Sequence, residues 1–191
     1  MKNEAISHQT KERLAASLKR AMQKKPFDRI TVKELLDDCD ISRPTFYYHF
    51  EDIYDLMKWM FETEMVELLA KSEDCFTWDE GILLLLQYAV DNKAVCLCAY
   101  NSVGYDELRR IFYESVSGML RRFVNVLLTD IPAKPEHIEF IIEFYTSAFA
   151  STCLSWLKGG AKESPEQMIA LYEIAAFGTI REALERSAAQ R

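Results

Sequence analysis

A seven-residue stretch near the amino end of the chain, RPTFYYH at residues 43–49, gathers side chains that bind polar partners in several ways. The guanidinium of Arg43 keeps its positive charge and offers a planar fork of N–H donors, which suits phosphate oxygens and paired acceptors on a flat ring. One threonine hydroxyl, two tyrosine hydroxyls and one imidazole follow within the same stretch. This combination favours binding of an anionic or planar polar surface, provided that these side chains point away from the protein's own core.

The residues around this stretch predict a short helix with two different faces. Ser42 is a natural N-cap, and Pro44 is tolerated in the first helical turn. Phe46 and Phe50 lie one helical turn apart, so they share a face that we expect to be buried. A helix of this length can bury only one face. The side chains that this leaves at the surface are Arg43, Thr45, Tyr47, Tyr48 and His49.

A second short helix is predicted directly before this one. Thr31 and Glu34 form a capping-box pattern, Leu35 and Leu36 give the helix a buried side, and it should end near Cys39. Two short helices joined by a tight turn, here at about residues 31–50, form a helix-turn-helix unit, whose second helix enters the major groove of DNA. The free N–H groups at the start of the first of these helices suit a phosphate. The unit therefore predicts binding to double-stranded DNA.

The stretch TVKELLDDCDISRPTFYYHFEDIYDLM resembles the amino-terminal DNA-binding domain of the TetR/AcrR family of transcriptional regulators, and the resemblance covers about residues 8–70. The positions at which this family touches DNA fall on Thr31, Lys33, Arg43, Pro44, Thr45, Tyr47, Tyr48 and His49. Many relatives carry a lysine shortly after the final aromatic residue, whereas Glu51, Asp52 and Ile53 stand there in this chain. This departure implies weaker nonspecific binding to DNA.

Purely structural interpretations of the same residues, without DNA contact, remain open. Tyr47 and Tyr48 could pack under a neighbouring helix, and His49 could be a hydrogen-bonded boundary residue. Arg43 could be a solvated charge, because the acidic residues Asp37, Asp38 and Asp40 are close to it in sequence.

Residues 71–191 are predicted to form a larger helical domain for effector binding and dimerisation. The first helix of the chain should run from an N-cap at Thr10 to about Lys25. Further helices are expected at about residues 52–71, 79–91, 93–100, 105–129, 136–157 and 165–185. Breaks are expected at Ile131–Pro135 and at Gly159-Gly160.

The stretch YTSAFASTCLSWLKGGAKESPEQMI is similar to the last two helices of the DhaS-like subgroup of the TetR/AcrR family. In the family these helices pair with their copies, which implies a homodimer. The residues that this pairing would use are Phe149, Cys153, Trp156, Ile169, Tyr172 and Ala176.

Aromatic side chains with a few hydroxyl groups could line a cavity for a small organic effector. The candidates for such a pocket are Tyr88, Cys96, Tyr100, Tyr113, Phe144, Tyr145 and Phe149. Ordinary core packing is the other interpretation for each of them, and the sequence does not identify the effector.

The composition fits a packed helical protein, because 49% of the 191 residues are hydrophobic and only 6 are Gly and 5 Pro. The net charge of −7 is unevenly distributed: residues 1–50 carry 10 basic and 7 acidic side chains (+3), and residues 51–191 carry 13 and 23 (−10). An acidic balance normally disfavours nucleic-acid binding. A helical module that binds a protein partner and has no DNA activity therefore stays open.

Other classes of protein find little support. The polar amino end is no signal peptide, and the apolar run Ile82–Leu86 is too short to cross a membrane. The 5 cysteines lack disulfide or zinc spacing and suit the reducing cytoplasm. We find no phosphate loop, nucleophile motif or metal-ligand pattern, so no enzyme, metal or cofactor is expected. We expect a cytoplasmic, all-α, homodimeric regulator that binds a palindromic operator as an effector-responsive repressor; co-activation with a partner protein is the alternative.

Overall fold

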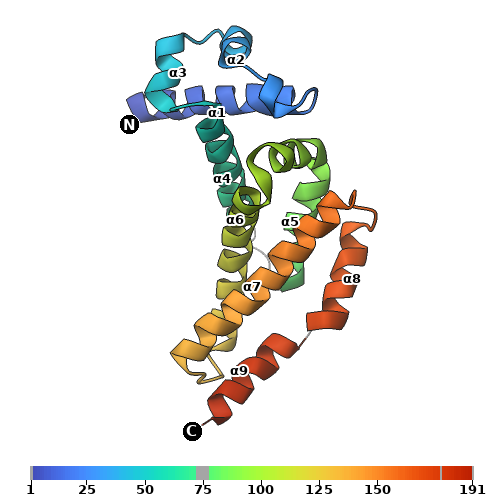
Figure 1. Ribbon diagram of the computed structural model, residues 1–191. Helices are drawn as coiled ribbons and strands as arrows, with labels where there is room; N and C mark the ends of the chain where they lie inside the picture. Colours follow the sequence, from blue (N-terminus) through green and yellow to red (C-terminus); the bar gives the residue numbers. More distant parts are fainter. Residues whose placement is uncertain (1, 72–77, 177, 191) are drawn as a thin grey trace. The chain divides into compact units, whose positions relative to one another are not determined.

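The computed structural model describes residues 2–71, 78–176 and 178–190 (Figure 1). These residues form nine α-helices and one short 3₁₀ helix and no strand, which confirms the predicted all-α fold. Packing divides the chain into two compact units, which we call unit 1 (Met1–Met65 with Lys93–Leu108) and unit 2 (Val66–Asn92 with Arg109–Arg191). The predicted domain boundary between residues 70 and 71 stays a prediction, because residues 72–77 lie outside the described part of the chain.

Unit 1 is built from the amino-terminal helices and a later helical segment. Its elements are α1 (Lys2–Met22), η1 (Phe27–Arg29), α2 (Val32–Cys39), α3 (Arg43–His49), most of α4 (Ile53–Lys71) and the first part of α6 (Lys93–Leu127). Figure 1 shows α2 and α3 on the same side of α1. As the apolar spacing predicts, Leu14 and Leu18 of α1 are fully buried, together with Leu35 and Phe46 from α2 and α3.

The first helix begins earlier than the sequence suggested. Thr10 lies inside α1, where its hydroxyl donates a hydrogen bond to the carbonyl oxygen of Ile6 at 2.9 Å. The prediction that Thr10 caps this helix is therefore wrong. A threonine inside a helix satisfies its hydroxyl on the preceding turn, so a hydroxyl residue alone does not mark a helix start.

The two helices of the helix-turn-helix unit are capped as predicted. At α2, the hydroxyl of Thr31 accepts a hydrogen bond from the N–H of Glu34 at 3.4 Å. At α3, the hydroxyl of Ser42 accepts one from the N–H of Thr45 at 3.3 Å and is 2.7 Å from the hydroxyl of Thr45. Each cap satisfies a backbone donor that the helix itself leaves free, and so fixes where the helix begins.

Helix α2 is tied to α1 by polar contacts around the side chain of Asp38. Its carboxylate accepts hydrogen bonds from the Ser17 hydroxyl at 2.6 Å and from the guanidinium of Arg20 at 2.5 Å. In addition, the Arg13 guanidinium donates to the carbonyl oxygen of Cys39. The hydrogen bond from Ser17 and then that from Arg20 lower the pKa of Asp38 below its ordinary value. The carboxylate is therefore bonded in its charged form.

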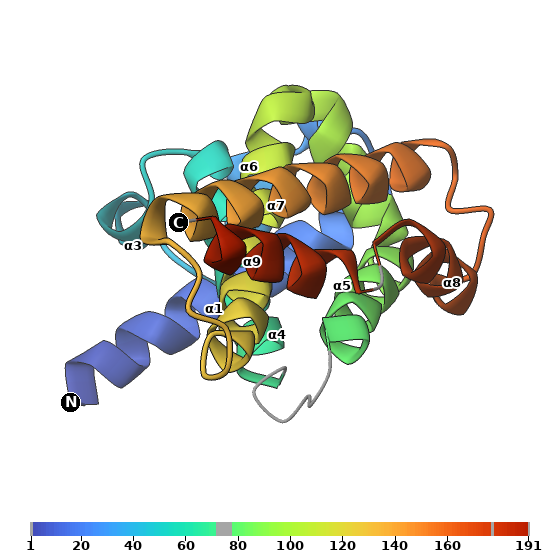
Figure 2. The same cartoon turned by 90° about the horizontal axis from the view of Figure 1, so that it is seen from below.

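Unit 2 is a helical assembly around its own apolar core. Its elements are α5 (Trp78–Asp91), the second part of α6, α7 (Pro135–Lys158), α8 (Pro165–Ala176) and α9 (Thr179–Ala189). Helix α7 packs beside α9, and α5 packs beside α8 (Figure 2). The α6–α7–α9 part of the core includes Leu120, Val124, Ile142, Ile180 and Leu184.

Helix α6 is one continuous helix of 35 residues, so the predicted break between residues 100 and 105 is wrong. The Ser102 hydroxyl bonds the carbonyl oxygen of Cys98 at 2.7 Å, an arrangement that a helix accommodates. Gly104 inside the helix costs only about 1 kcal/mol relative to alanine. Fully buried side chains on both sides of it, such as Cys96 and Phe112, outweigh that cost.

The carboxy-terminal segment forms two helices, α8 and α9, where the sequence predicted one from residue 165 to about residue 185. Gly178 has a φ of +76°, a backbone conformation that ends a helix and that glycine adopts without strain. The predicted turn at Gly159-Gly160 is confirmed, and Gly160 has a φ of +98°.

Taken singly, one described helix, α7, is long and apolar enough to cross a membrane. Half of its most apolar window is buried inside the protein. The core helix of a water-soluble protein has the same properties, so α7 gives only weak support for a membrane span.

The contacts of Asp38 predict a pH-dependent contribution to stability. A carboxylate whose pKa is lower in the folded than in the unfolded chain stabilises the fold above the unfolded pKa of about 3.9, and the benefit is lost as pH falls through the folded pKa. Asp38→Asn should therefore melt at lower temperature than the wild type at pH 7, and the two should converge towards pH 2–3. Circular dichroism melts across this range measure the effect.

The matched control is Asp37→Asn, which removes the neighbouring carboxylate and breaks no hydrogen bond in the described part of the chain. This variant should keep the wild-type pH profile. Parallel profiles for Asp38→Asn and the wild type would contradict the assignment.

The cap of α3 gives a second prediction. Ser42→Ala should lower the free energy of unfolding by about 1 kcal/mol, because the Thr45 N–H loses its acceptor, whereas Ser42→Asn restores an acceptor and should come close to the wild type. Urea unfolding measured by circular dichroism separates the two variants. Equal midpoints for alanine and asparagine would show that Ser42 is not the cap on which α3 depends.

Candidate nucleic-acid interface

The orientation of α3 is set by its apolar face. Phe46 is fully buried and Phe50 is 3% exposed, and their ring centres are 5.9 Å apart. On the opposite side Tyr48 is 81% exposed and Tyr47 is 48% exposed. Arg43 and Pro44 are exposed as well, and Thr45 and His49 are half-buried. The structure thus gives α3 the outward polar face that its spacing predicted.

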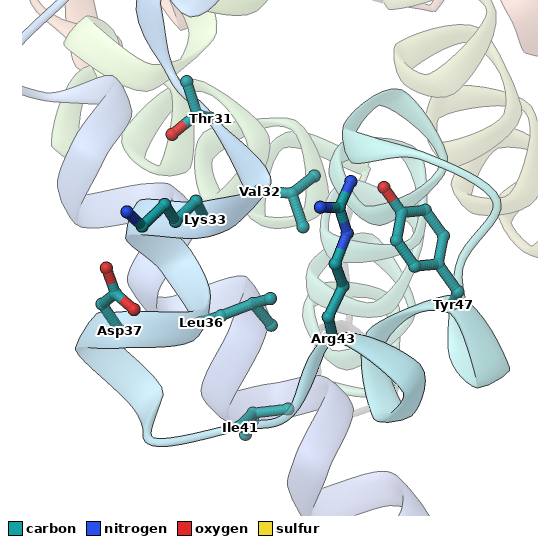
Figure 3. A pocket seen from close by; sticks show the side chains of 8 residues that line it. All are labelled: Thr31, Val32, Lys33, Leu36, Asp37, Ile41, Arg43 and Tyr47. Carbon is teal, nitrogen blue, oxygen red and sulfur yellow. The ribbon is translucent and has the colours of Figure 1, made fainter.

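A surface hollow of about 510 Å³ lies between α2 and α3. Figure 3 shows Arg43 and Tyr47 on one side of it and Thr31, Lys33 and Asp37 on the other. The hollow brings together four of the eight residues predicted to contact DNA, which are Thr31, Lys33, Arg43 and Tyr47. The remaining four, Pro44, Thr45, Tyr48 and His49, belong to α3 outside this hollow.

Asp37 also lines the hollow, although it is not among the residues predicted to contact DNA. A carboxylate repels phosphates but accepts a hydrogen bond from the amino group of cytosine. No local pattern distinguishes it from the neighbouring acidic residues. The position of Asp37 in the hollow depends on how α2 packs against α3.

The basic side chains of unit 1 fall into two groups. Several are held by carboxylates within the protein: Arg20 by Asp38 at 2.5 Å, Lys25 by Glu34 at 2.6 Å and Lys19 by Glu64 at 2.8 Å. Within the described residues, by contrast, Lys33 and Arg43 form no ion pair. The guanidinium of Arg43 lies 5.6 Å from the centre of the Tyr47 ring, a cation–π contact that leaves its donor edge available. Positive charge is thus available on the hollow that lies between the two helices.

His49 is the last residue of α3. Its ring is 5.0 Å from that of Tyr48 in an edge-to-face contact. Burial, and to a lesser degree the positive charge of Lys11, lower the pKa of His49. The imidazole is therefore neutral at neutral pH and offers one N–H donor and one acceptor.

The seven residues predicted to line an effector pocket are divided between the two units. Cys96 and Tyr100 belong to unit 1, and the other five belong to unit 2. Cys96 and Phe149 are buried, whereas Phe144 is 59% exposed. The hydroxyl of Tyr145 donates to the hydroxyl of Thr179 at 2.8 Å. These residues do not form one described cavity, and the assignment of a pocket to them stays a prediction.

The residues predicted for the dimer interface differ in how deeply they are buried within the chain. Phe149, Cys153 and Trp156 are buried within a single chain, and Phe149 packs edge-to-face on Tyr172 at 4.9 Å. Ile169, Tyr172 and Ala176 are half-buried. The large apolar side chains that α7 and α8 expose are Phe140, Phe144, Leu171 and Ile174. Helical periodicity revealed that these helices are apolar, but it did not reveal which apolar side faces the chain's own core.

Two family models match the chain. One described as "Bacterial regulatory proteins, tetR family" matches residues 14–59, and one described as "Transcriptional regulator C-terminal region" matches residues 77–178. The HTH-type dhaKLM operon transcriptional activator DhaS of Lactococcus lactis subsp. lactis (strain IL1403) is 32% identical over 84 residues, which is 44% of this chain and 45% of that protein. The match thus spans less than half the length of this curated relative.

Two solved structures share the fold. "Dihydroxyacetone kinase operon activator DhaS" superposes with a TM-score of 0.75 at 22% identity, covering 91% of this chain and 97% of the other. A TetR transcriptional regulator from Streptococcus agalactiae 2603V gives a TM-score of 0.63 at 20% identity, with 93% and 98% coverage. At these identities the likeness shows the fold alone. Together with the family models, it confirms the resemblance inferred from the helix-turn-helix residues: the chain belongs to the TetR family of DNA-binding transcriptional regulators.

Proposed function

We propose that two copies of this chain bind a two-fold symmetric operator, and that each copy inserts α3 into the major groove. The observation that carries this proposal is the outward face of α3, where Arg43 and Tyr47 share a hollow with Lys33 of α2. A helix buried on one side and polar on the other is what a major groove can accept.

The side chains divide into those that read sequence and those that position the helix. Arg43 and Thr45, near the amino end of α3, are placed to reach base edges, and a guanidinium pairs with the acceptor edge of guanine. Tyr47, Tyr48 and His49 offer hydrogen bonds to phosphate oxygens, and Pro44, exposed in the first turn of the same helix, is proposed to contact DNA as well. Thr31 and Lys33 hold a further phosphate at the start of α2, where backbone N–H groups point outward.

The homodimer is proposed from the exposed apolar side chains of α7 and α8. Phe140 and Phe144 of α7 are 67% and 59% exposed with ring centres 6.4 Å apart, and Ile174 of α8 is 85% exposed. Adjoining exposed apolar side chains favour a protein–protein contact, and in a two-fold dimer each copy offers the same surface to the other. The two α3 helices would then meet half-sites about one helical turn apart, ~34 Å, or a multiple of this.

The regulatory output is proposed to respond to a small organic effector bound among the aromatic residues of the carboxy-terminal domain. Repression is the expectation that the family resemblance carries, and co-activation with a partner protein is the alternative. The relative from Lactococcus lactis is named as an activator of its operon, which favours a direct test of both directions. Transcription from an operator-bearing template, with and without the protein, shows whether its addition lowers or raises the product.

A second candidate function is a helical module that binds a protein partner, which the net charge of −7 favours. A salt titration of DNA binding distinguishes the two. Neutralising phosphates releases counterions, so the affinity of a DNA-binding protein falls steeply as salt rises.

Replacing Arg43 tests the groove assignment. Arg43→Ala should weaken binding to operator fragments selected from genomic DNA by about 1–3 kcal/mol, or about fivefold to more than a hundredfold, because the bidentate contact is lost. Fluorescence anisotropy at fixed salt measures the change. Arg186→Ala removes the same charge from α9 and should leave the affinity unchanged. If Arg43→Ala binds operator and random DNA as the wild type does, Arg43 reads no base.

The dimer proposal is tested by placing charge on the exposed apolar side chains of α7 and α8. Phe144→Asp combined with Ile174→Asp should raise the dimer dissociation constant by a factor on the order of 100 or more, because a symmetric interface buries each new carboxylate twice. Sedimentation velocity should give twice the 22.2 kDa chain mass for the wild type and the single mass for the variant. Val66→Asp, at a side chain 65% exposed on α4, serves as the control and should remain a dimer. A wild type that sediments as a monomer would contradict the proposal.

A further inference from the structure

The ammonium group of a lysine in α1 lies against two aromatic rings. The Nζ atom of Lys11 lies 5.5 Å from the ring centre of Phe50 and 5.6 Å from that of Trp59. The two rings are 5.9 Å apart, and Trp59 comes from α4. We call Phe50 and Trp59 the Lys11 cradle. Both rings are within the distance at which an aromatic face attracts a cation, so the ammonium group is held in place.

The cradle lies at the carboxy-terminal end of α3. The ring centres of His49 and Phe50 are 6.4 Å apart, and the ring of Tyr48 is 5.0 Å from that of His49. Lys11 therefore lies near His49, which is proposed to bind phosphate at this end of the helix, and His49 in turn contacts Tyr48. The effect of its charge on the His49 imidazole is a second sign of their proximity.

Several carboxylates lie close in sequence to Lys11 and Phe50, and three of them have partners within the protein. Asp52 accepts hydrogen bonds from the N–H groups of Tyr54 and Asp55, at 2.8 and 2.9 Å, at the start of α4. Asp55 accepts one from the N–H of Glu51 at 3.1 Å. On α1, Glu12 is 3.4 Å from the imidazole of His8. Within the described residues, Lys11 forms no ion pair with any of them.

Because of these carboxylates, the positive charge of Lys11 affects how strongly DNA is repelled or attracted. Acidic residues at the start of α4 repel a phosphate that approaches the carboxy-terminal end of α3, and a cation held over Phe50 at this end offsets the repulsion. An ammonium group is a point charge without the planar fork of arginine, so it suits a phosphate rather than a base edge. Because the two rings already restrict the side chain, it loses less conformational freedom when it binds.

We propose that Lys11, held over Phe50 and Trp59, binds a backbone phosphate of DNA next to the contacts of Tyr48 and His49. The inference rests on the proposed function, since it requires α3 to lie in the major groove. It adds α1 to the helices that contact DNA, and it assigns to this contact a role in affinity for any DNA sequence.

Lys11→Met tests the assignment, because methionine keeps an unbranched apolar side chain over the rings and removes the charge. Loss of one phosphate contact should reduce the slope of log K against log salt by about 0.9. Binding to operator and to random DNA should weaken by the same factor. The ratio of wild-type affinity to Lys11→Met affinity should also fall about threefold between 50 and 200 mM salt, because the wild type makes one more salt-dependent contact.

Two further variants complete the design. Lys11→Arg keeps the charge and the cation–π contacts and should retain the wild-type slope. Lys24→Met removes a lysine just beyond the other end of α1 and should leave slope and affinity unchanged. Melting curves for all three establish that the fold is intact.

The outcomes separate this inference from the proposed function. If the wild type shows steep salt dependence, Arg43→Ala weakens operator binding and Lys11→Met matches the wild type, Lys11 binds no phosphate and the inference fails alone. If the wild type itself binds no DNA at low salt, the proposed function fails with it. A Lys11→Met variant that loses operator binding but keeps binding to random DNA would also overturn the inference, because a phosphate contact carries no sequence preference.

Discussion

The burial of Phe46 and Phe50 decides where every other side chain of α3 points. Burying an aromatic ring of this size contributes roughly 1.5–3 kcal/mol, and rotating the helix to expose Phe46 would also force Arg43 or Tyr48 towards an apolar interior. Both effects act in the same direction. A seven-residue helix is too short to be stable alone, so its orientation comes from this contact and from the cap at Ser42.

The same arrangement links the reading helix to the rest of unit 1. Phe50, the residue that ends α3, contacts Trp59 of α4, and through the Lys11 cradle it also contacts α1. Asp38 joins α2 to α1 through Ser17 and Arg20. Side chains of α1 and α4 therefore hold the helix-turn-helix pair at both ends, which fixes the direction in which the outward face of α3 points.

Local signals predicted this part of the molecule well and the long helices less well. The capping pairs Thr31–Glu34 and Ser42–Thr45 lie within a few residues of each other, so the sequence shows them directly. Whether Gly104 or Gly178 interrupts a helix depends on packing by distant residues, and here the first is accommodated and the second is not. Lys11 contacts two residues far along the chain, Phe50 and Trp59, and no local sequence pattern predicts such a contact.

The ion pairs inside unit 1 have a consequence for how the regulator is distributed in a cell. Arg20, Lys19 and Lys25 are neutralised by carboxylates of the protein itself, and residues 51–191 carry a net charge of −10, from 13 basic and 23 acidic side chains. Attraction to the chromosome at large depends on uncompensated positive charge, and both these ion pairs and the acidic remainder of the chain reduce it. DNA of unrelated sequence is then expected to bind the protein weakly. We therefore expect a larger share of its copies to remain available to a genuine target.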